Sequence, residues 1–361
     1  MIVEVRTHRV SARLHTPFVT ALRSTRTVET VVVEIIDANG NRGFGEAPQV
    51  WQVTGESLAG SQGCIDGPLA GVVKGRDADD LVPLLRDVSR TVAANVGAKA
   101  AMDVALHDLV AHRRGVSLPI LLGADNHRVP TDVTLSVGAI ADLGLAAQAR
   151  VAEGFGVLKL KVGTDATADI ARVRVARDAV GPDTKIRLDA NQGWGARQAV
   201  NAILAMEDDG LDLELVEQPV AARDIAGLAW VTDHVRTPIM ADESVFGVRD
   251  LTEVIARRAA DMVNVKIAKC GGLLPARTLL DLAAAHEMGT IVGSMMETHV
   301  GVGAAASLVA VYGTTATSDL DAAWWAEESP YDGGMNYDGA TVVLPQSAGL
   351  GIAGIRKEVR R

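Results

Sequence analysis

KIRLDAN (185–191), LELVEQP (213–219) and PIMADES (238–244) are three short segments of one pattern, in which a mostly apolar run ends at an acidic side chain. Stretches with helical periodicity separate them. This alternation predicts parallel strands that are joined by crossover helices. The pattern extends in both directions, and the eight predicted strands are 131–138, 157–163, 185–191, 213–219, 238–244, 262–267, 289–295 and 317–322. Eight units at a spacing of about 25 residues predict a closed α/β barrel, similar to a TIM barrel.

The residues on either side of the barrel predict a second unit. Residues 1–36 alternate apolar and polar side chains as two strands do, with a loop over His15–Thr25 between them. The Asn-Gly pair at 39–40 marks a hairpin turn, and 56–124 has helical spacing. No full helix follows the eighth strand. The Gly-rich and apolar residues 330–361 are therefore expected to pack back on the first unit.

These expectations divide the chain into two domains. We predict an α+β capping domain over residues 1–125 that is completed by 325–361. We predict the barrel, with seven βα units and a final strand, over residues 126–324. The barrel domain is expected to carry the catalytic groups, because barrel enzymes place their active sites at the carboxyl ends of the strands.

Composition excludes several classes of function. The chain has 361 residues, with 45 acidic against 35 basic ones, and a formal charge of −10. Nucleic-acid binders usually carry a basic excess, so we expect no nucleic-acid partner. No apolar run reaches the roughly 18 residues of a membrane helix, and the first residues lack the apolar core of a signal peptide. With two distant cysteines, Cys64 and Cys270, we expect a cytoplasmic protein without a disulfide framework. We also expect a homo-oligomer.

Three carboxylates predict a metal site. Asp189, Glu217 and Asp242 end three consecutive strands and are spaced by 28 and 25 residues, about one βα unit each. Carboxylates that meet at one point repel one another unless a cation lies between them. An all-oxygen ligand set suits a hard ion, most often Mg²⁺. One of these residues alone could be a helix cap or a surface carboxylate, but the matched spacing of all three favours a metal site.

Four of the eight lysines lie in two short segments. Lys159 and Lys161 are two residues apart, so both point to the same side of their strand, either to the barrel lumen or to the helices. Two neighbouring ammonium groups lower each other's pKa, which favours a neutral amine. Lys266 lies four strands away on the opposite wall, and lysines on opposite walls suit proton transfer on both faces of a carbon acid. Structural ion pairs are the alternative, and they are the expected role of Lys269.

The eighth strand ends in Asp319-Leu320-Asp321, and its two carboxylates share a face. Since three other carboxylates already suffice for a metal ion, this pair indicates a cationic group on the substrate, such as an ammonium. The alternative is that the two carboxylates cap the following turn.

As a set, these motifs resemble the enolase superfamily, in its muconate-lactonizing-enzyme subgroup. The motifs span nearly the whole chain and are Lys-x-Lys, Asp-Ala-Asn-Gln-Gly-Trp, Val-Glu-Gln-Pro, Ala-Asp-Glu-Ser, and Asn-x-Lys followed by Cys-Gly-Gly. The resemblance implies a (β/α)7β barrel with a capping domain built from both termini. It also implies Mg²⁺ on the three strand-end carboxylates, Lys161 and Lys266 as the two acid/base catalysts, and Lys159 as a support for the first.

Within that subgroup the chain is most similar to the dipeptide epimerases, especially those acting on L-Ala-D/L-Glu. Asp319-x-Asp321 matches their Asp-x-Asp, which binds the α-ammonium of the dipeptide. The loop from Pro17 to Arg23 resembles their substrate lid, in which an Arg pairs with the glutamate side chain, and Arg matches a carboxylate as a bidentate fork. Ser136 fits a substrate-contacting position, with a plain hydroxyl at the barrel rim as the alternative.

The resemblance therefore implies a Mg²⁺-dependent dipeptide epimerase that inverts the α-carbon of the C-terminal residue through a metal-stabilised enediolate. An N-succinylamino-acid racemase or an o-succinylbenzoate synthase is the alternative within the family, although neither needs an ammonium anchor. A cycloisomerase offers no role for the Asp pair. A non-catalytic barrel would predict broken ligand sets, and a pyridoxal-phosphate racemase would leave the carboxylates unexplained.

Several residues depart from the family pattern. Trp324 and Trp325 stand where a proline is expected soon after the Asp-x-Asp, and they could roof the pocket or pack on the capping domain. Trp51 lies in the second lid segment, and His299 could line the pocket or start a helix. The Trp-rich rim favours a dipeptide that is Ala-Glu-like or bulkier.

Overall fold

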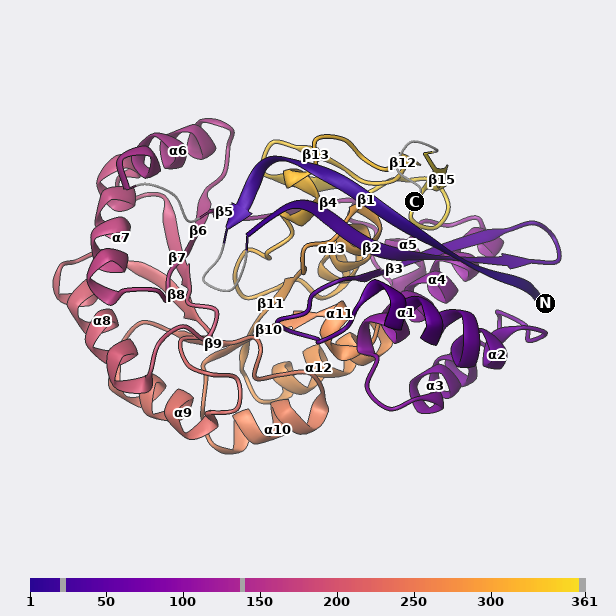
Figure 1. Cartoon of the computed structure of the whole chain (residues 1–361), viewed down its shortest axis with the longest axis horizontal. Helices are drawn as coiled ribbons and strands as arrows, with labels where there is room; N and C mark the ends of the chain where they lie inside the picture. Colours follow the sequence, from indigo (N-terminus) through magenta and orange to yellow (C-terminus); the bar gives the residue numbers. More distant parts are fainter. Residues whose placement is uncertain (20–23, 137–139, 357–361) are drawn as a thin grey trace.

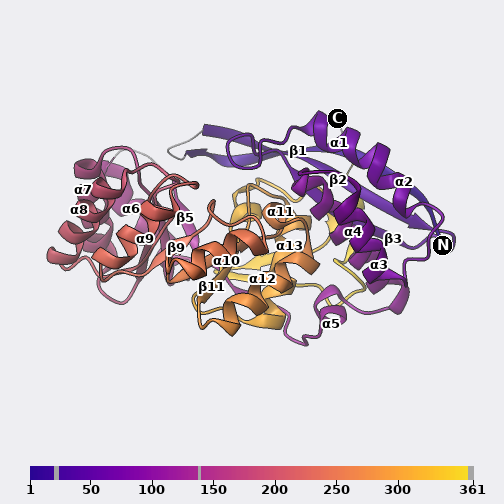
Figure 2. The ribbon, with the colours of Figure 1, turned by 90° about the horizontal axis from the view of Figure 1, so that it is seen from below.

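The structure, a computed structural model, describes residues 1–19, 24–136 and 140–356. Helices form an outer arc around a curved set of strands in Figure 1, and an antiparallel sheet from the N-terminal residues lies beside them. Viewed from the side in Figure 2, the long hairpin of this sheet extends over the barrel. The two predicted units are therefore both present and in contact.

The N-terminal sheet is antiparallel, with the order β1-β2-β3. Its strands are β1 (Ile2–Val19), β2 (Ser24–Asp37) and β3 (Arg42–Pro48). The helices that follow are α1 (Leu58–Cys64), a π-helical turn η1 (Ile65–Leu69), α2 (Ala70–Val73), α3 (Leu81–Thr91), α4 (Val96–Arg114) and α5 (Leu118–Leu122). Strand β3 lies so close to α4 that a Cβ at Gly43 or Gly45 would overlap the α4 backbone. The two glycines therefore permit the close packing of sheet and helix.

The first hairpin is longer than the sequence predicts. The expected loop over His15–Thr25 is largely wrong, because β1 continues to Val19 and β2 begins at Ser24. Phe18 pairs with Thr25 after a register shift in β1. The extension is stabilised by burial of the Phe18 ring, whose centroid lies 5.2 Å from that of Trp325. Residues 20–23, including the predicted lid residue Arg23, lie outside the described residues.

The barrel consists of parallel strands with helices on their outer side, as predicted. The strands, in spatial order, are β5 (Val133–Leu135), β6 (Val157–Lys161), β7 (Lys185–Asp189), β8 (Leu213–Glu217), β9 (Ile239–Ala241), β10 (Met262–Lys266) and β11 (Gly289–Gly293). The helices are α6 (Ile140–Ala152), α7 (Ala166–Val180), α8 (Ala196–Asp208), α9 (Ile225–His234), α10 (Val248–Ala256), α11 (Ile267–Cys270), α12 (Leu273–Ala285) and α13 (His299–Tyr312).

The predicted eighth strand, 317–322, is reduced to two single bridges that close the barrel. Asp319 pairs with Gly293 of β11, and Ser318 pairs with Thr131 just before β5. A 3₁₀ turn, η2 (Ala322–Trp325), begins at the last residue of the predicted strand and ends its extended conformation. The closing segment is therefore short, but it connects the two edges of the sheet, at β5 and β11.

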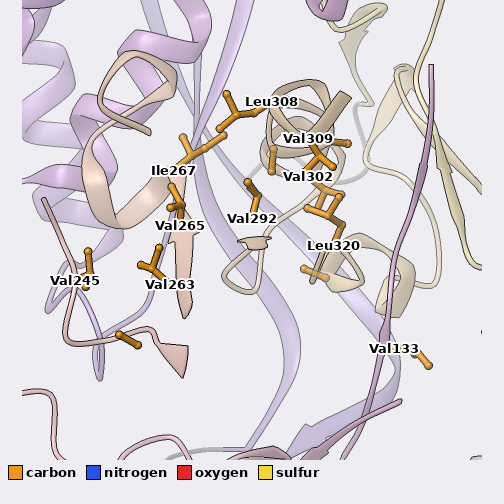
Figure 3. Close-up of a cluster of buried hydrophobic side chains, with 14 of the residues drawn as sticks. Val133, Val245, Val263, Val265, Ile267, Val292, Val302, Leu308, Val309 and Leu320 are labelled. Carbon is orange, nitrogen blue, oxygen red and sulfur yellow. The ribbon is translucent and has the colours of Figure 1, made fainter. Parts of the chain in front are cut away.

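Alternation along the barrel strands separates the core from the site. Figure 3 shows Val263, Val265 and Val292 in one apolar cluster with Val302 and Leu308 of α13. Because successive side chains of a strand point to opposite faces, Asn264 and Lys266, which alternate with Val263 and Val265, point into the barrel. The outer face of the strands thus stabilises the barrel, while the inner face carries the charged groups together with a second buried apolar cluster, Leu215, Met240, Met262 and Ile291.

The C-terminal residues return to the first unit, as predicted. Their strands, together with the short β4, are β4 (Arg128–Pro130), β12 (Tyr331–Gly333), β13 (Asn336–Asp338), β14 (Thr341–Val343) and β15 (Ile352–Ile355). The Leu350 N–H donates to Asp108 of α4 at 2.6 Å, and Arg42 donates to the Ala353 carbonyl at 2.9 Å. The domain boundaries, 1–125 with 325–361 and 126–324, stay a prediction.

Candidate active site

The predicted metal ligands lie at one end of the barrel. Asp189 and Glu217 are the last residues of β7 and β8 and are partners in the parallel register. Asp242 follows β9 directly. All three carboxylates are fully or almost fully buried. The shared carboxyl-terminal edge of parallel strands therefore gathers three acidic side chains that are far apart in sequence.

Each of these carboxylates contacts a lysine ammonium group. The three ion pairs are Lys161–Asp189 at 2.6 Å, Lys159–Glu217 at 2.6 Å and Lys266–Asp242 at 2.8 Å. Lys159 additionally donates to Asp319 at 2.7 Å, which answers the question left open by the sequence: the lysines of β6 point into the lumen. Lys269, expected to be structural, contacts Asp242 Oδ1 at 2.5 Å from the other side.

The pKa of Lys159 shifts in the direction opposite to the expected one. Burial lowers the pKa of this ammonium group, but Asp319, Glu217 and Asp189 outweigh burial and raise its pKa well above the ordinary value. The prediction of a lowered pKa, made from the neighbouring lysine alone, is therefore wrong for Lys159. The pKa of Lys266 is also raised, by neighbouring carboxylates against the effect of burial.

The three strand-end carboxylates differ in their pKa. Burial raises the pKa of each, but at Asp189 the charges of Lys161, Lys159 and Lys266 together outweigh burial and lower the pKa to about 2. Lys266 and Lys269 together lower the pKa of Asp242 in the same way. At Glu217, burial and the charge of Asp189 dominate and raise the pKa to about 7. The group thus contains two firmly ionised carboxylates and a third that an added positive charge would ionise.

The donor chemistry of this group fits Mg²⁺. All of its donors are carboxylate oxygens, and the cavity beside them adds the amide oxygen of Asn191 and Oε2 of Glu243, both without a hydrogen-bond partner among the described residues. Oxygen-only sites of this kind suit hard divalent cations. Within the described chain, no three acidic, His or Cys side chains stand together as a ready-made metal group. We attribute this to the lysine ammonium groups, which occupy the carboxylate oxygens that an ion would bind.

A single cavity connects the catalytic and substrate-binding candidates. The barrel residues that line it include Thr134, Lys161, Asn191, Asp242, Glu243, Lys266, Asp319 and Asp321. The capping domain contributes Phe18, Val50, Gln52 and Val53. Lys161 and Lys266 therefore face one space from β6 and β10. Asn191, Glu243 and Thr134 were not predicted as site residues, although the first two stand inside the Asp-Ala-Asn and Ala-Asp-Glu motifs.

Three donors from different parts of the barrel and its closing segment hold the Asp pair. Asp319 Oδ2 accepts from Lys159, and Asp321 Oδ2 accepts from the Thr134 N–H at 2.7 Å and from Trp325 Nε1 at 3.1 Å. Burial and the charge of Asp319 raise the pKa of Asp321, while these two donors lower it. Both residues line the cavity that Lys161 also lines. Their predicted role in binding an ammonium group stays a prediction.

Ser136 does not line this cavity. Its hydroxyl accepts a hydrogen bond from the Val19 N–H at 2.6 Å and lies 3.2 Å from the Val19 carbonyl oxygen. It borders a separate groove with Pro17 and Trp324. The structure therefore brings Ser136 to the end of β1, and its predicted contact with substrate stays a prediction, as does that of Arg23.

The other aromatic candidates divide between packing and exposure. Trp324 and Trp325 pack against His15 of β1, with ring centroids 4.8 and 5.3 Å away. Trp51 is 57% exposed and does not line the cavity. His299 starts α13 and is buried, and burial lowers its pKa to about 4. Packing on the capping domain is thus the observed environment of the Trp pair.

The fold and the charged residues at its strand ends define a class of protein. It is the enolase-type barrel that is covered by an antiparallel capping sheet. Residues 2–123 match the mandelate racemase / muconate lactonizing enzyme N-terminal domain, and residues 142–357 match the enolase C-terminal domain-like family. The chain therefore belongs to the mandelate racemase / muconate lactonizing enzyme family of the enolase superfamily. These matches confirm the predicted family and the barrel fold.

Relatives are similar over nearly the full length. The L-Ala-D/L-Glu epimerase of Bacillus subtilis is 41% identical, and the match covers 98% of this chain and 97% of that protein. The structure of a substrate-liganded complex of the Bacillus subtilis enzyme has a TM-score of 0.95 at 40% identity, covering 98% and 99% of the two chains. The dipeptide epimerase from Enterococcus faecalis, complexed with Mg and L-Leu-L-Tyr, has a TM-score of 0.94 at 37% identity, with the same coverage.

Proposed function

We propose that this protein is a Mg²⁺-dependent dipeptide epimerase that inverts the α-carbon of the C-terminal residue. The observation that carries the proposal is the arrangement of Lys161 and Lys266, which come from β6 and β10 and line one cavity. Two amines that approach a carbon from opposite sides can remove its proton from one face and return a proton to the other. The names of the relatives support a dipeptide as the substrate.

The two lysines divide the proton transfer between them. Lys161 removes the α-proton of one epimer and Lys266 donates a proton to the opposite face, and the roles reverse for the other epimer. Mg²⁺ on Asp189, Glu217 and Asp242 supplies positive charge that stabilises the substrate carboxylate as the α-proton leaves. Lys161, Lys159 and Lys266 now contact the carboxylate oxygens that would hold the ion; with those oxygens bound to the ion, Lys161 and Lys266 would be free to face the substrate.

Other buried charges set the orientation of the substrate. Lys159 is 1% exposed and contacts both Glu217 and Asp319, so it supports the catalytic group without reaching the cavity. Asp319 and Asp321 supply negative charge for the N-terminal ammonium of the dipeptide. Arg23 is proposed to pair with an acidic side chain of the substrate, and Ser136 to contact it at the rim.

Deuterium exchange tests the proposed function. We would incubate the protein with Mg²⁺ in D₂O against a mixed library of L,L-dipeptides and N-succinylamino acids, and follow mass gain by mass spectrometry. We expect exchange of the C-terminal α-proton in dipeptides, fastest for Ala-Glu-like or bulkier members. Exchange confined to N-succinylamino acids would replace the proposal with the racemase alternative.

Assembly and location are further expectations. Among the described helices, none is long and apolar enough to cross a bilayer. We propose a cytoplasmic homo-oligomer without a nucleic-acid partner, and the free thiols of Cys64 and Cys270 agree with a reducing compartment. Light scattering of the purified protein tests the oligomeric state, and a monomeric mass would contradict it.

A further inference from the structure

Trp325 lies in the η2 turn, four residues after Asp321 in sequence and in direct contact with it. Its indole Nε1 donates a hydrogen bond to Asp321 Oδ2 at 3.1 Å, and the side chain is 5% exposed. A buried indole N–H normally finds an acceptor, but a backbone carbonyl would satisfy it as well as a carboxylate. Here the acceptor is one of the two acidic groups that face the cavity.

The carboxylate of Asp321 is fixed by two donors on one oxygen. Thr134 of β5 donates its backbone N–H to Oδ2 at 2.7 Å, and Trp325 donates to the same oxygen. Within the described residues, no hydrogen bond is made to Oδ1, and Asp321 lines the cavity. Two donors on Oδ2 hold the plane of the carboxylate, which leaves Oδ1 for a cationic group.

These donors also oppose two unfavourable effects at Asp321. The carboxylate is buried, and Asp319 brings a second negative charge two residues away. Burial and a like charge both favour the neutral acid, whereas N–H donors favour the charged form. A neutral Asp321 would attract an ammonium group much less strongly than an ionised one.

The ring of Trp325 connects this carboxylate to the capping domain. It stacks on His15 with a centroid distance of 5.3 Å and an angle of 14° between the planes, and it meets Phe18 edge-on at 5.2 Å. Phe18 lines the cavity, and the Lys161 ammonium lies 6.0 Å from its ring centroid. The position of Trp325, and with it the hydrogen bond, therefore depends on the end of β1.

We propose that Trp325 is a positioning residue for ammonium recognition: its N–H orients the Asp321 carboxylate toward the N-terminal amine of the substrate and favours its charged form, and its ring fixes that geometry to the end of β1. This inference rests on the proposed function. A purely structural Trp325 would pack against β1 and affect all ligands equally.

Trp325→Phe separates these roles, because Phe keeps an aromatic ring against His15 and Phe18 but has no N–H donor. The probes are L-Ala-L-Glu and N-propionyl-L-Glu, which differ only in the N-terminal amine, and their Kd values are measured by calorimetry with Mg²⁺ present. We expect the Kd of L-Ala-L-Glu to rise about tenfold, as for loss of a hydrogen bond to a charged group. The Kd of N-propionyl-L-Glu should change less than twofold.

Trp324→Phe is the matched control. Trp324 packs on the same His15 ring, but within the described structure its indole makes no hydrogen bond to either carboxylate of the pair. Its backbone N–H donates to the Asp321 carbonyl at 2.9 Å, and Phe keeps this bond, so both Kd values should stay within twofold. An equal rise for both probes in Trp325→Phe, or no rise for L-Ala-L-Glu, would overturn the role of Trp325.

A double-substitution cycle tests whether Trp325→Phe acts through the Asp321 carboxylate or through packing. In an Asp321→Asn background, adding Trp325→Phe should change the Kd of L-Ala-L-Glu less than twofold, since the carboxylate acceptor is already gone. A further tenfold loss there would show that Trp325 acts through packing, against the proposal. If the wild-type protein binds neither this dipeptide nor any other, the proposed function itself fails, which is a different outcome from a failure in the variants alone.

Discussion

Lys161→Ala will abolish epimerisation in both directions, with a fall in kcat/KM of at least about 10³-fold, within the range of a lost general base. Lys161 lines the cavity from β6 and contacts Asp189, and among the described residues that line the cavity no other amine comes from that wall. Lys266 remains on the opposite wall. We therefore expect one of the two dipeptide epimers still to exchange its α-proton with D₂O, without inversion, while the other does not.

Lys266→Ala provides the reciprocal result. It should retain exchange only for the epimer that Lys161→Ala cannot exchange, and proton NMR of each pure epimer in D₂O measures both. Lys185→Ala is the control, because Lys185 is an exposed residue of β7 that pairs with Glu214 outside the site. Epimerisation by either active-site variant, or exchange of both epimers by one of them, would remove that lysine from its role.

Removal of divalent cations will abolish turnover but leave the fold intact. Exhaustive chelation should lower kcat by more than about 10³-fold, because the ion would supply the positive charge that stabilises the substrate carboxylate as the α-proton leaves. The melting temperature should fall by only a few degrees. The ammonium groups of Lys159, Lys161, Lys266 and Lys269 already neutralise the carboxylates that an ion would bind, so the repulsion that would open the barrel is absent.

Calorimetric melting with and without a chelator, together with an assay restored by added Mg²⁺, measures both effects. Asp242→Asn is a useful comparison, since it removes a ligand without a chelator. Full turnover after chelation would contradict the metal site. Cooperative unfolding at ordinary temperature after chelation would contradict the expectation that the lysine ammonium groups neutralise these carboxylates without an ion.

The arrangement of the barrel was accessible from sequence because its strands carry strong local signals. Buried parallel strands are short apolar runs, and the acidic residue at the end of each gives both the boundary and the register. The sequence therefore predicted that Asp189, Glu217 and Asp242 lie close together. The final strand was harder to predict, because it consists of two single bridges, Asp319 with Gly293 and Ser318 with the distant Thr131.

Features that depend on contacts between several distant elements could not be predicted from the sequence. The pKa of Lys159 was predicted from its neighbour in the same strand, whereas the carboxylates that raise it come from three other strands. The length of the first hairpin depended on burial of Phe18 against Trp325, which is more than 300 residues away in sequence. The contact between Ser136 and Val19 likewise joins two domains.

The central claim is that two lysines transfer protons at opposite faces of one α-carbon. Its most direct test is the wild-type reaction in D₂O with Mg²⁺ and the dipeptide that exchanges fastest in the library, with product and remaining substrate separated and analysed by mass spectrometry at early times. Our account predicts inverted product that carries one deuterium at the C-terminal α-carbon, because the lysine that donates is not the one that removed the proton. Inverted product that retains the original protium, or no inversion of any dipeptide, would contradict it.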